Sequence, residues 1–231
     1  MPPNAERLAE SIRGRLASFR SALDAELTEC GRLPGSVAIL AVSKRQPIPA
    51  VRAAVDAGQR LFGENYLQEA AEKFESLRAL GVPAELHFIG HLQSNKANRI
   101  AALCDAVESL DRPEAALALE KGAARAQRRL PVLLQLNISP SERFGCPPEQ
   151  AERLAEIVRG CEHLRLDGVM AVAPLGTSAE ISAAFELAAK TLALVGGKTL
   201  SIGMSADWRE AVRAGSTMLR IGSALFGARP S

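Results

Sequence analysis

Apolar runs alternate with helical patterns eight times along this 231-residue chain, and this repetition restricts its fold more than any other feature. The first run, VAILAV at 37–42, is continuous and apolar, as in a parallel strand that is buried on both faces. Further strands are expected at 60–62, 86–89, 106–109, 131–138, 164–170, 199–202 and 216–221. Strict alternation predicts a parallel sheet, and eight units in this length predict an α/β fold, a single small (β/α)8 TIM barrel. A doubly wound open sheet is the alternative.

The segment ahead of the first strand is an additional element. Apolar residues recur at helical spacing from Leu8 to Leu27, which predicts a helix over 4–27. This helix lies within an N-terminal segment, 1–30, that is expected to pack on the barrel. The remaining helices are expected at 49–57, 65–80, 94–103, 113–127, 148–160, 178–194 and 206–214. No long linker separates these elements, so residues 1–231 are expected to form one domain.

Composition and charge argue against several classes of protein. A net charge of +2 and 4% aromatic residues give no reason to expect nucleic acid or an anionic membrane as a partner. The amino terminus, MPPNAERLAESIRGR, lacks the apolar core of a secretory signal, and no apolar run approaches the roughly 18–20 residues of a membrane span. A cytoplasmic protein with reduced thiols is expected, because no CxxC pair links the four cysteines, Cys30, Cys104, Cys146 and Cys161.

The stretch from 200 to 227, LSIGMSADWREAVRAGSTMLRIGSALFG, contains two glycine-serine turns that each follow a strand. Gly203 ends the first of these strands, and Ser205 is expected to be the N-cap of the helix at 206–214. Gly222 and Ser223 open a further helix after the next strand. Unpaired N–H groups at two helix starts suit a phosphate dianion. Phosphate sites in such barrels favour the loops after strands seven and eight, where these two turns lie.

Two cationic side chains indicate what kind of phosphate compound would bind. Lys44 leaves the apolar first strand directly, in AVSKRQP, where partial desolvation makes an amine more nucleophilic. Arg220 is the lone charge in the apolar run TMLRIG and therefore needs a partner. An amine beside a phosphate cradle suggests a Schiff base with a phosphorylated aldehyde or ketone.

Six segments carry a family resemblance that runs from about residue 36 to residue 228. They are LAVSKRQP, FGENYLQEA, HFIGHLQSNKAN, LLQLNIS, LDGVMAVAP and GMSADWREAVRAGSTMLRIGSALFG. With these motifs the chain resembles the YggS/PROSC family of pyridoxal 5′-phosphate (PLP) homeostasis proteins. The resemblance implies a barrel similar to the amino-terminal domain of alanine racemase, with PLP as the cofactor, held as an internal aldimine on Lys44.

The same resemblance implies how the cofactor is surrounded. It assigns contacts to six more residues: Asn65 beside the ring, Met204 lining the site, Ser205, Gly222 and Ser223 at the phosphate, and Arg220 facing the pyridine nitrogen. Arginine can only donate hydrogen bonds, so it favours an unprotonated pyridine. An unprotonated pyridine weakens the electron sink on which most PLP enzymes depend.

The function implied is a PLP-binding protein of vitamin B6 homeostasis that buffers or delivers the cofactor, with indirect effects on amino-acid metabolism. Its partners would be PLP and PLP-dependent apo-enzymes, and a monomer is favoured because the chain has no room for a β-domain. An amino-acid racemase is the alternative, but it needs a second acid/base group, and Tyr66 is the only tyrosine. A third reading is an aldolase-like barrel that uses Lys44 on a sugar phosphate with Glu64 as the base.

Two positions depart from the family pattern. Many members have a histidine before the Asp-Arg pair that follows the fourth strand, where this chain has Glu108 in ESLDR. Many carry a lysine after the fifth strand, where this chain has Arg143 in ERFGC. Roles of those family residues are therefore not transferred. Two alternatives stay open: Arg220 pairs with a barrel carboxylate instead of the cofactor, and His87 is either near the cofactor or packed in the core.

Overall fold

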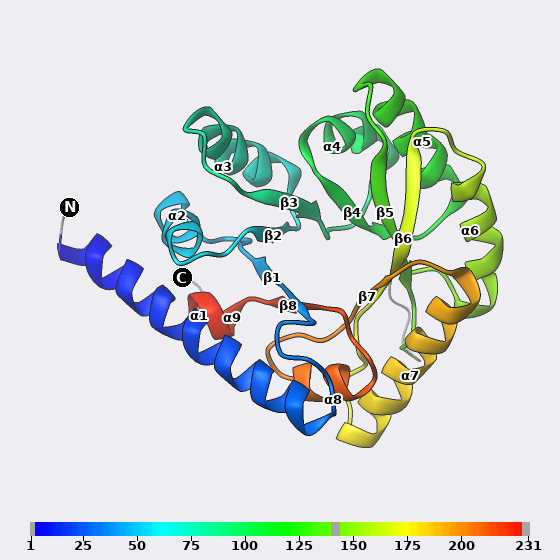
Figure 1. Cartoon of the computed structure of the whole chain (residues 1–231). Helices are drawn as coiled ribbons and strands as arrows, with labels where there is room; N and C mark the ends of the chain where they lie inside the picture. The colour runs from blue at the N-terminus through cyan, green and yellow to red at the C-terminus, as the bar shows by residue number, and fades with distance from the viewer. Residues whose placement is uncertain (1–2, 140–143, 228–231) are drawn as a thin grey trace.

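The computed structural model describes residues 3–139 and 144–227, in which eight parallel strands close into a barrel (Figure 1). The strands are β1 (Ala38–Val42), β2 (Leu61–Glu64), β3 (Glu85–Phe88), β4 (Ala106–Leu110), β5 (Leu130–Leu136), β6 (Leu164–Ala171), β7 (Thr199–Ser201) and β8 (Met218–Ile221). They follow one another in chain order around the barrel, and β8 pairs with β1 so that Arg220 lies opposite Leu40. The predicted α/β barrel is confirmed, and the alternative prediction of a doubly wound open sheet is wrong.

Helices connect the strands and cover the outside of the barrel (Figure 1). They are α1 (Pro3–Glu29), α2 (Ile48–Asp56), α3 (Leu67–Ala79), α4 (Ala97–Leu103), α5 (Pro113–Arg125), α6 (Ala151–Arg159), α7 (Ser178–Val195), α8 (Trp208–Arg213) and α9 (Ser223–Phe226). Where the sequence predicts unbroken helices at 94–103 and 148–160, each begins with a 3₁₀ turn, η1 (Ser94–Lys96) and η2 (Pro148–Gln150). Such tight first turns are common at helix starts.

Side chains along each strand alternate between the outer core and the interior of the barrel. On β1, Ile39 and Ala41 belong to the large apolar core beneath the helices, and Leu40 between them faces the interior. The same alternation turns five buried apolar side chains inward: Leu40, Ala106, Leu133, Met170 and Met218. It also turns four buried polar side chains inward: His87, Glu108, Ser201 and Arg220. The barrel interior therefore contains buried polar side chains among the apolar ones.

The helix ahead of the first strand forms as predicted and lies along α2, α8 and α9 (Figure 1). Its apolar stripe is buried from Ile12 to Leu27. Within this stripe, Phe19 meets Trp208 of α8 edge to face, with 5.4 Å between the ring centroids. α1 thereby supports the helix that follows the turn after β7.

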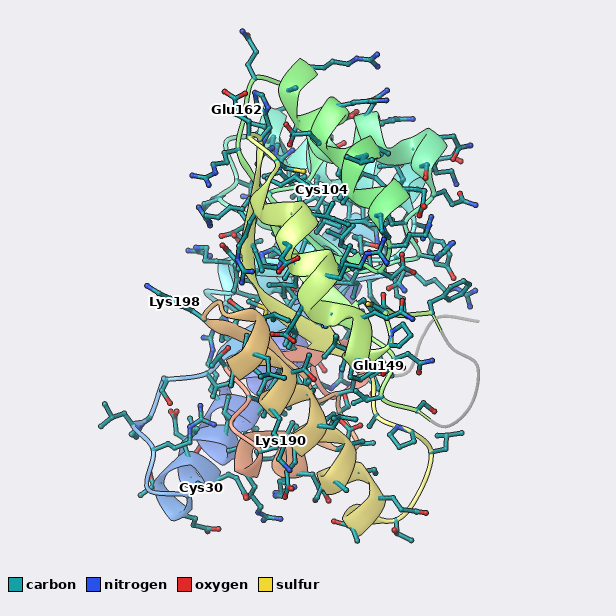
Figure 2. All side chains as sticks on the ribbon, turned by 90° about the vertical axis from the view of Figure 1, so that its right-hand side faces the viewer. Cys30, Cys104, Glu149, Glu162, Lys190 and Lys198 are labelled. Carbon is teal, nitrogen blue, oxygen red and sulfur yellow. The ribbon has the colours of Figure 1, made fainter. Side chains whose placement is uncertain are left out.

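The four cysteines, all within the described residues, are free thiols. Cys104 and Cys146 are buried, and Cys30 and Cys161 are partly exposed. Figure 2 shows Cys30 and Cys104 in well-separated parts of the molecule. Among the helices of residues 3–139 and 144–227, none combines the length and the apolar character needed to cross a membrane.

Candidate functional site

The predicted site residues lie at the carboxyl ends of four strands that are consecutive around the barrel, β7, β8, β1 and β2. Lys44 follows β1, Asn65 follows β2, Met204 and Ser205 follow β7, and Gly222 and Ser223 follow β8. The turn after β8 touches the end of β1, since a Cβ added at Gly222 would lie 3.6 Å from the Val42 carbonyl oxygen. The closed barrel thus brings residues that are about 180 positions apart in sequence, Lys44 and Gly222, to one edge.

Ser205 is not the N-cap of the helix after β7, and this prediction is wrong. The helix α8 begins at Trp208 with Asp207 at its N-cap, and Asp207 Oδ1 accepts a hydrogen bond of 2.5 Å from the Met204 N–H. Because this aspartate closes the turn with its own side chain, the serine is available for a long-range contact. Its Oγ accepts a hydrogen bond of 3.3 Å from the Ala224 N–H. The two glycine-serine turns are therefore joined to each other.

The turn after β8 presents backbone donors beside this serine. Gly222 is the N-cap of α9, and its carbonyl oxygen accepts hydrogen bonds from the N–H groups of Leu225 and Phe226. The N–H groups at the start of a helix have no acceptor within it. The first turn of α9 and the Ser205 hydroxyl together form a donor set that suits an anion.

Arg220 crosses the barrel interior from β8 towards β6. The side chain is buried, and its Nη1 donates to Ser201 O at 2.5 Å and to Ser201 Oγ at 2.9 Å. Its Nη2 donates to Ala171 O at 2.7 Å. Burial lowers the pKa of Arg220, and the negative charges of Glu108 and Asp207 oppose that shift. The Arg220 guanidinium is thus held at the carboxyl ends of β6 and β7 by hydrogen bonds to Ala171 and Ser201.

Glu108 is the carboxylate that links the other polar side chains of the barrel interior. It is fully buried, its Oε2 accepts a hydrogen bond of 2.6 Å from Ser201 Oγ, and its Oε1 lies 2.7 Å from His87 Nδ1. Burial disfavours the charged form of Glu108, but the hydrogen bond and charge of His87, the charge of Arg220 and the hydrogen bond from Ser201 together lower the pKa of this carboxyl group. Arg220 therefore contacts this carboxylate only indirectly, through the Ser201 hydroxyl group, and it forms no direct ion pair with a carboxylate among the described residues.

His87 lies inside the barrel and bonds carboxylates on both of its ring nitrogens. Nδ1 meets Glu108, and Nε2 lies 3.2 Å from Oε1 of Glu85, whose side chain is about half exposed. Burial would lower the pKa of this imidazole, but the two carboxylates outweigh it and raise the pKa of His87 to about 9. Sequence reasoning missed Ser201, which connects this pair to Arg220. The available signal was a polar residue between two apolar ones in LSI.

Lys44 and Asn65 lie on adjacent turns. Lys44 is partly exposed in the turn after β1. The Asn65 Oδ1 is buried and has no hydrogen-bond partner among the residues that the structure describes. The loop after β3 covers Asn65 closely, because a Cβ added at Gly90 would lie 2.0 Å from the Asn65 carbonyl oxygen. This amide oxygen therefore has an unused capacity to accept a hydrogen bond. Met204 is 37% exposed on the turn after β7. Arg143 lies outside the described residues.

The residues on which the alternative enzymes depend have other environments. Glu64 faces the helices, not the barrel interior, since it has the same strand parity as the core residue Phe62. Its Oε1 accepts hydrogen bonds from Ser43 Oγ at 2.8 Å and from Lys73 Nζ at 2.9 Å. Tyr66 is 50% exposed at the N-cap position of α3. A carboxylate bound in this way is not placed to act as the base of an aldolase.

Comparisons with known proteins give consistent matches. The family model for the alanine racemase N-terminal domain matches residues 20–230. The pyridoxal phosphate homeostasis protein of Escherichia coli is 42% identical over 229 residues, which cover 94% of this chain and 97% of that protein. The protein of the same name from Pseudomonas aeruginosa is 44% identical over 226 residues, 96% of each.

Solved structures agree with these matches. PipY of Synechococcus elongatus, solved with PLP bound, has a TM-score of 0.82 and 36% identity, covering 94% of this chain and all of that one. Alanine racemase from Corynebacterium glutamicum has a TM-score of 0.70 at 17% identity. That match covers 98% of this chain and 62% of the racemase, and it shows a shared fold alone.

Proposed function

This chain belongs to the alanine racemase N-terminal domain family and, within it, to the pyridoxal phosphate homeostasis proteins, and we propose that it binds PLP in order to buffer or deliver it. The observation that carries the proposal is the convergence of Lys44, the joined turns at Ser205 and Ala224, and the buried Arg220 on one edge of the barrel. An amine, an anion-binding donor set and a fixed cation are the groups that a phosphorylated pyridine aldehyde requires.

The residues at this edge fit the parts of PLP. When bound, PLP supplies an aldehyde that condenses with a primary amine, and Lys44 is the amine we assign to it. The Ser205 hydroxyl and the N–H groups of Gly222 and Ser223 bind the phosphate. The buried Asn65 Oδ1, which lacks a partner among the described residues, accepts a hydrogen bond beside the ring. Met204 lines the same edge.

Arg220 supports a carrier over an enzyme. Its guanidinium is anchored to carbonyl oxygens of β6 and β7, and it offers only donors to a pyridine nitrogen. A nitrogen that accepts a hydrogen bond from arginine stays unprotonated, and the cofactor is then a weaker electron sink. The relatives are likewise named as homeostasis proteins. We infer that this chain stores PLP more readily than it uses it.

Hydrogen exchange at the α-carbon of amino acids separates a carrier from a racemase. The PLP-loaded protein is incubated with several amino acids in D₂O, and deuterium uptake is compared with that in an equal concentration of PLP alone. We expect no uptake above that of PLP alone, because a racemase needs a second acid/base group. Tyr66 is the only tyrosine in the chain, and it is half exposed at the N-cap position of α3. Turnover above it would favour the racemase.

We further propose that PLP-dependent apo-enzymes receive the cofactor, and that the protein acts in the cytoplasm as a monomer whose residues 1–231 form one domain. The free thiols of all four cysteines support a reducing compartment. The net charge of +2 supports small-molecule and protein partners over nucleic acid. Delivery is tested by mixing the PLP-loaded protein with an apo-enzyme and measuring how fast the enzyme becomes active. Activation faster than with the same concentration of free PLP would indicate direct transfer.

A further inference from the structure

A buried cluster of charges on β2 and α3 lies against the turn that carries Lys44. Lys73, in the middle of α3, has a side chain that is only 6% exposed. Its Nζ donates to Ser43 O at 2.7 Å, to Glu64 Oε1 at 2.9 Å and to Glu69 Oε1 at 2.6 Å. An ammonium group has three N–H donors, so all of them are used within this cluster.

The cluster binds both chain neighbours of Lys44. On one side, Ser43 accepts from Lys73 through its carbonyl oxygen and donates to Glu64 Oε1 through its hydroxyl at 2.8 Å. On the other side, the Arg45 N–H donates to Glu69 Oε1. Arg45 has a φ of 60°, a left-handed conformation that non-glycine residues rarely adopt without support. The hydrogen bond to Glu69 supplies that support.

We propose that Lys73 and Glu69 are positioning residues for Lys44, which fix the turn after β1 so that the amine meets the aldehyde of PLP. This inference rests on the proposed function, in which PLP is attached to Lys44. Lys73 acts through the backbone, because its three donors are occupied by Ser43, Glu64 and Glu69. The turns to which we assign the phosphate follow β7 and β8, and none of the hydrogen bonds of this cluster reaches them.

A fixed turn affects bond formation more strongly than binding. A displacement of about 1 Å at a reacting atom can slow a reaction about 100-fold, since the bound groups no longer meet in the reactive geometry. Loosening the turn should therefore slow covalent capture of PLP and leave its phosphate-driven binding in place. A residue with a purely structural role would weaken both together.

The test compares PLP with pyridoxine 5′-phosphate, which has an alcohol in place of the aldehyde and cannot condense with an amine. In Glu69→Ala, the Arg45 N–H loses its acceptor, and we expect capture of PLP, followed by absorbance and borohydride trapping, to slow about 10-fold or more. Affinity for pyridoxine 5′-phosphate should stay within about 2-fold of the unmodified protein. Glu69→Gln keeps an acceptor oxygen and should capture PLP at nearly the original rate.

Two further variants serve as controls for misfolding and for effects of any substitution on α3. Lys73→Met alone would leave the buried Glu64 carboxylate without its cation. It is therefore combined with Glu64→Gln, which removes both charges of the pair. This double variant should behave like Glu69→Ala. Glu72→Ala changes an exposed residue of the same helix and should have no effect.

The outcomes separate this inference from the function on which it rests. An unmodified protein that captures no PLP would contradict the proposed function. If the unmodified protein captures PLP and Glu69→Ala does so at the same rate, the positioning role is wrong. Equal losses for PLP and for the alcohol analogue would also overturn it, because they indicate a structural effect.

Discussion

Glu108 and Arg220 share the hydroxyl group of Ser201, which donates to the carboxylate at 2.6 Å and accepts from the guanidinium at 2.9 Å. A buried guanidinium would be unstable without a nearby negative charge. Glu108 provides that charge from the opposite wall of the barrel and is itself paired with His87. The orientation of the cation that we assign to the pyridine nitrogen is therefore set by residues that have no role in binding the phosphate.

Glu108→Gln should destabilise the folded protein. The substitution removes the buried carboxylate between His87 and Ser201 and leaves His87 only the half-exposed Glu85, and breaking a buried ion pair typically costs about 3–5 kcal/mol. Urea unfolding of the two proteins at pH 7 measures the difference in the free energy of unfolding. An unchanged midpoint and slope would show that the network contributes nothing to stability.

A double-mutant cycle with His87→Gln tests whether the pair acts as a unit. If Glu108 and His87 stabilise each other, the double variant should be less destabilised than the sum of the two single variants. Additive losses would mean that the 2.7 Å contact carries no coupling.

The stability of the protein should also depend on pH through His87. Its pKa is about 9 in the folded protein, above the ordinary value of 6.5, so the folded state binds its proton more tightly. The contribution is complete below about pH 6.5 and is lost as pH rises through about 9, with a magnitude on the order of 3 kcal/mol. Urea unfolding between pH 6 and about 10 should show this decline, and His87→Gln should flatten it. A decline of equal size in the variant would assign it to other groups.

Ser205→Ala should weaken the retention of PLP. Loss of one charge-assisted hydrogen bond to the phosphate costs about 1–2 kcal/mol, or roughly 5- to 30-fold in affinity. The variant also removes the acceptor of the Ala224 N–H, which joins the two turns. Equilibrium dialysis with PLP measures the loss. Pyridoxal, which has no phosphate, should bind both proteins equally, and a parallel loss for pyridoxal would contradict a phosphate contact.

Lys44→Ala should separate covalent from phosphate-driven binding. The variant lacks the amine, so the absorbance of the covalent adduct should disappear. Part of the affinity for PLP should remain, because Ser205 and the turn after β8 are on other strands. Dialysis against PLP and against inorganic phosphate measures that remainder. Complete loss of PLP binding would mean that the turns contribute little.

Much of the fold follows from the sequence because its signals are local. Continuous apolar strands such as 37–42 and the glycines after the helices mark eight βα units, and their order leaves few arrangements other than a closed barrel. The edge at which Lys44, Asn65 and Gly222 meet follows from that barrel. Their roles towards PLP remain predictions.

Contacts between distant residues were not predictable in this way. Ser205 and Asp207 are both good N-cap residues, and only the position of Ala224 assigns the serine to another turn. Glu108 and Ser201 are 93 positions apart, and no local pattern indicates that they touch. Lys73 resembles an ordinary exposed lysine in the polar sequence AEKFES, and its burial becomes evident only once α3 is placed against the turn after β1.

Borohydride reduction of the PLP-loaded protein, followed by peptide mapping, identifies the residue to which PLP is attached. We expect a yellow protein in which reduction fixes one pyridoxyl group, on Lys44. A colourless protein that takes up no PLP would contradict the assignment of Lys44, and so would a pyridoxyl group fixed on any other lysine.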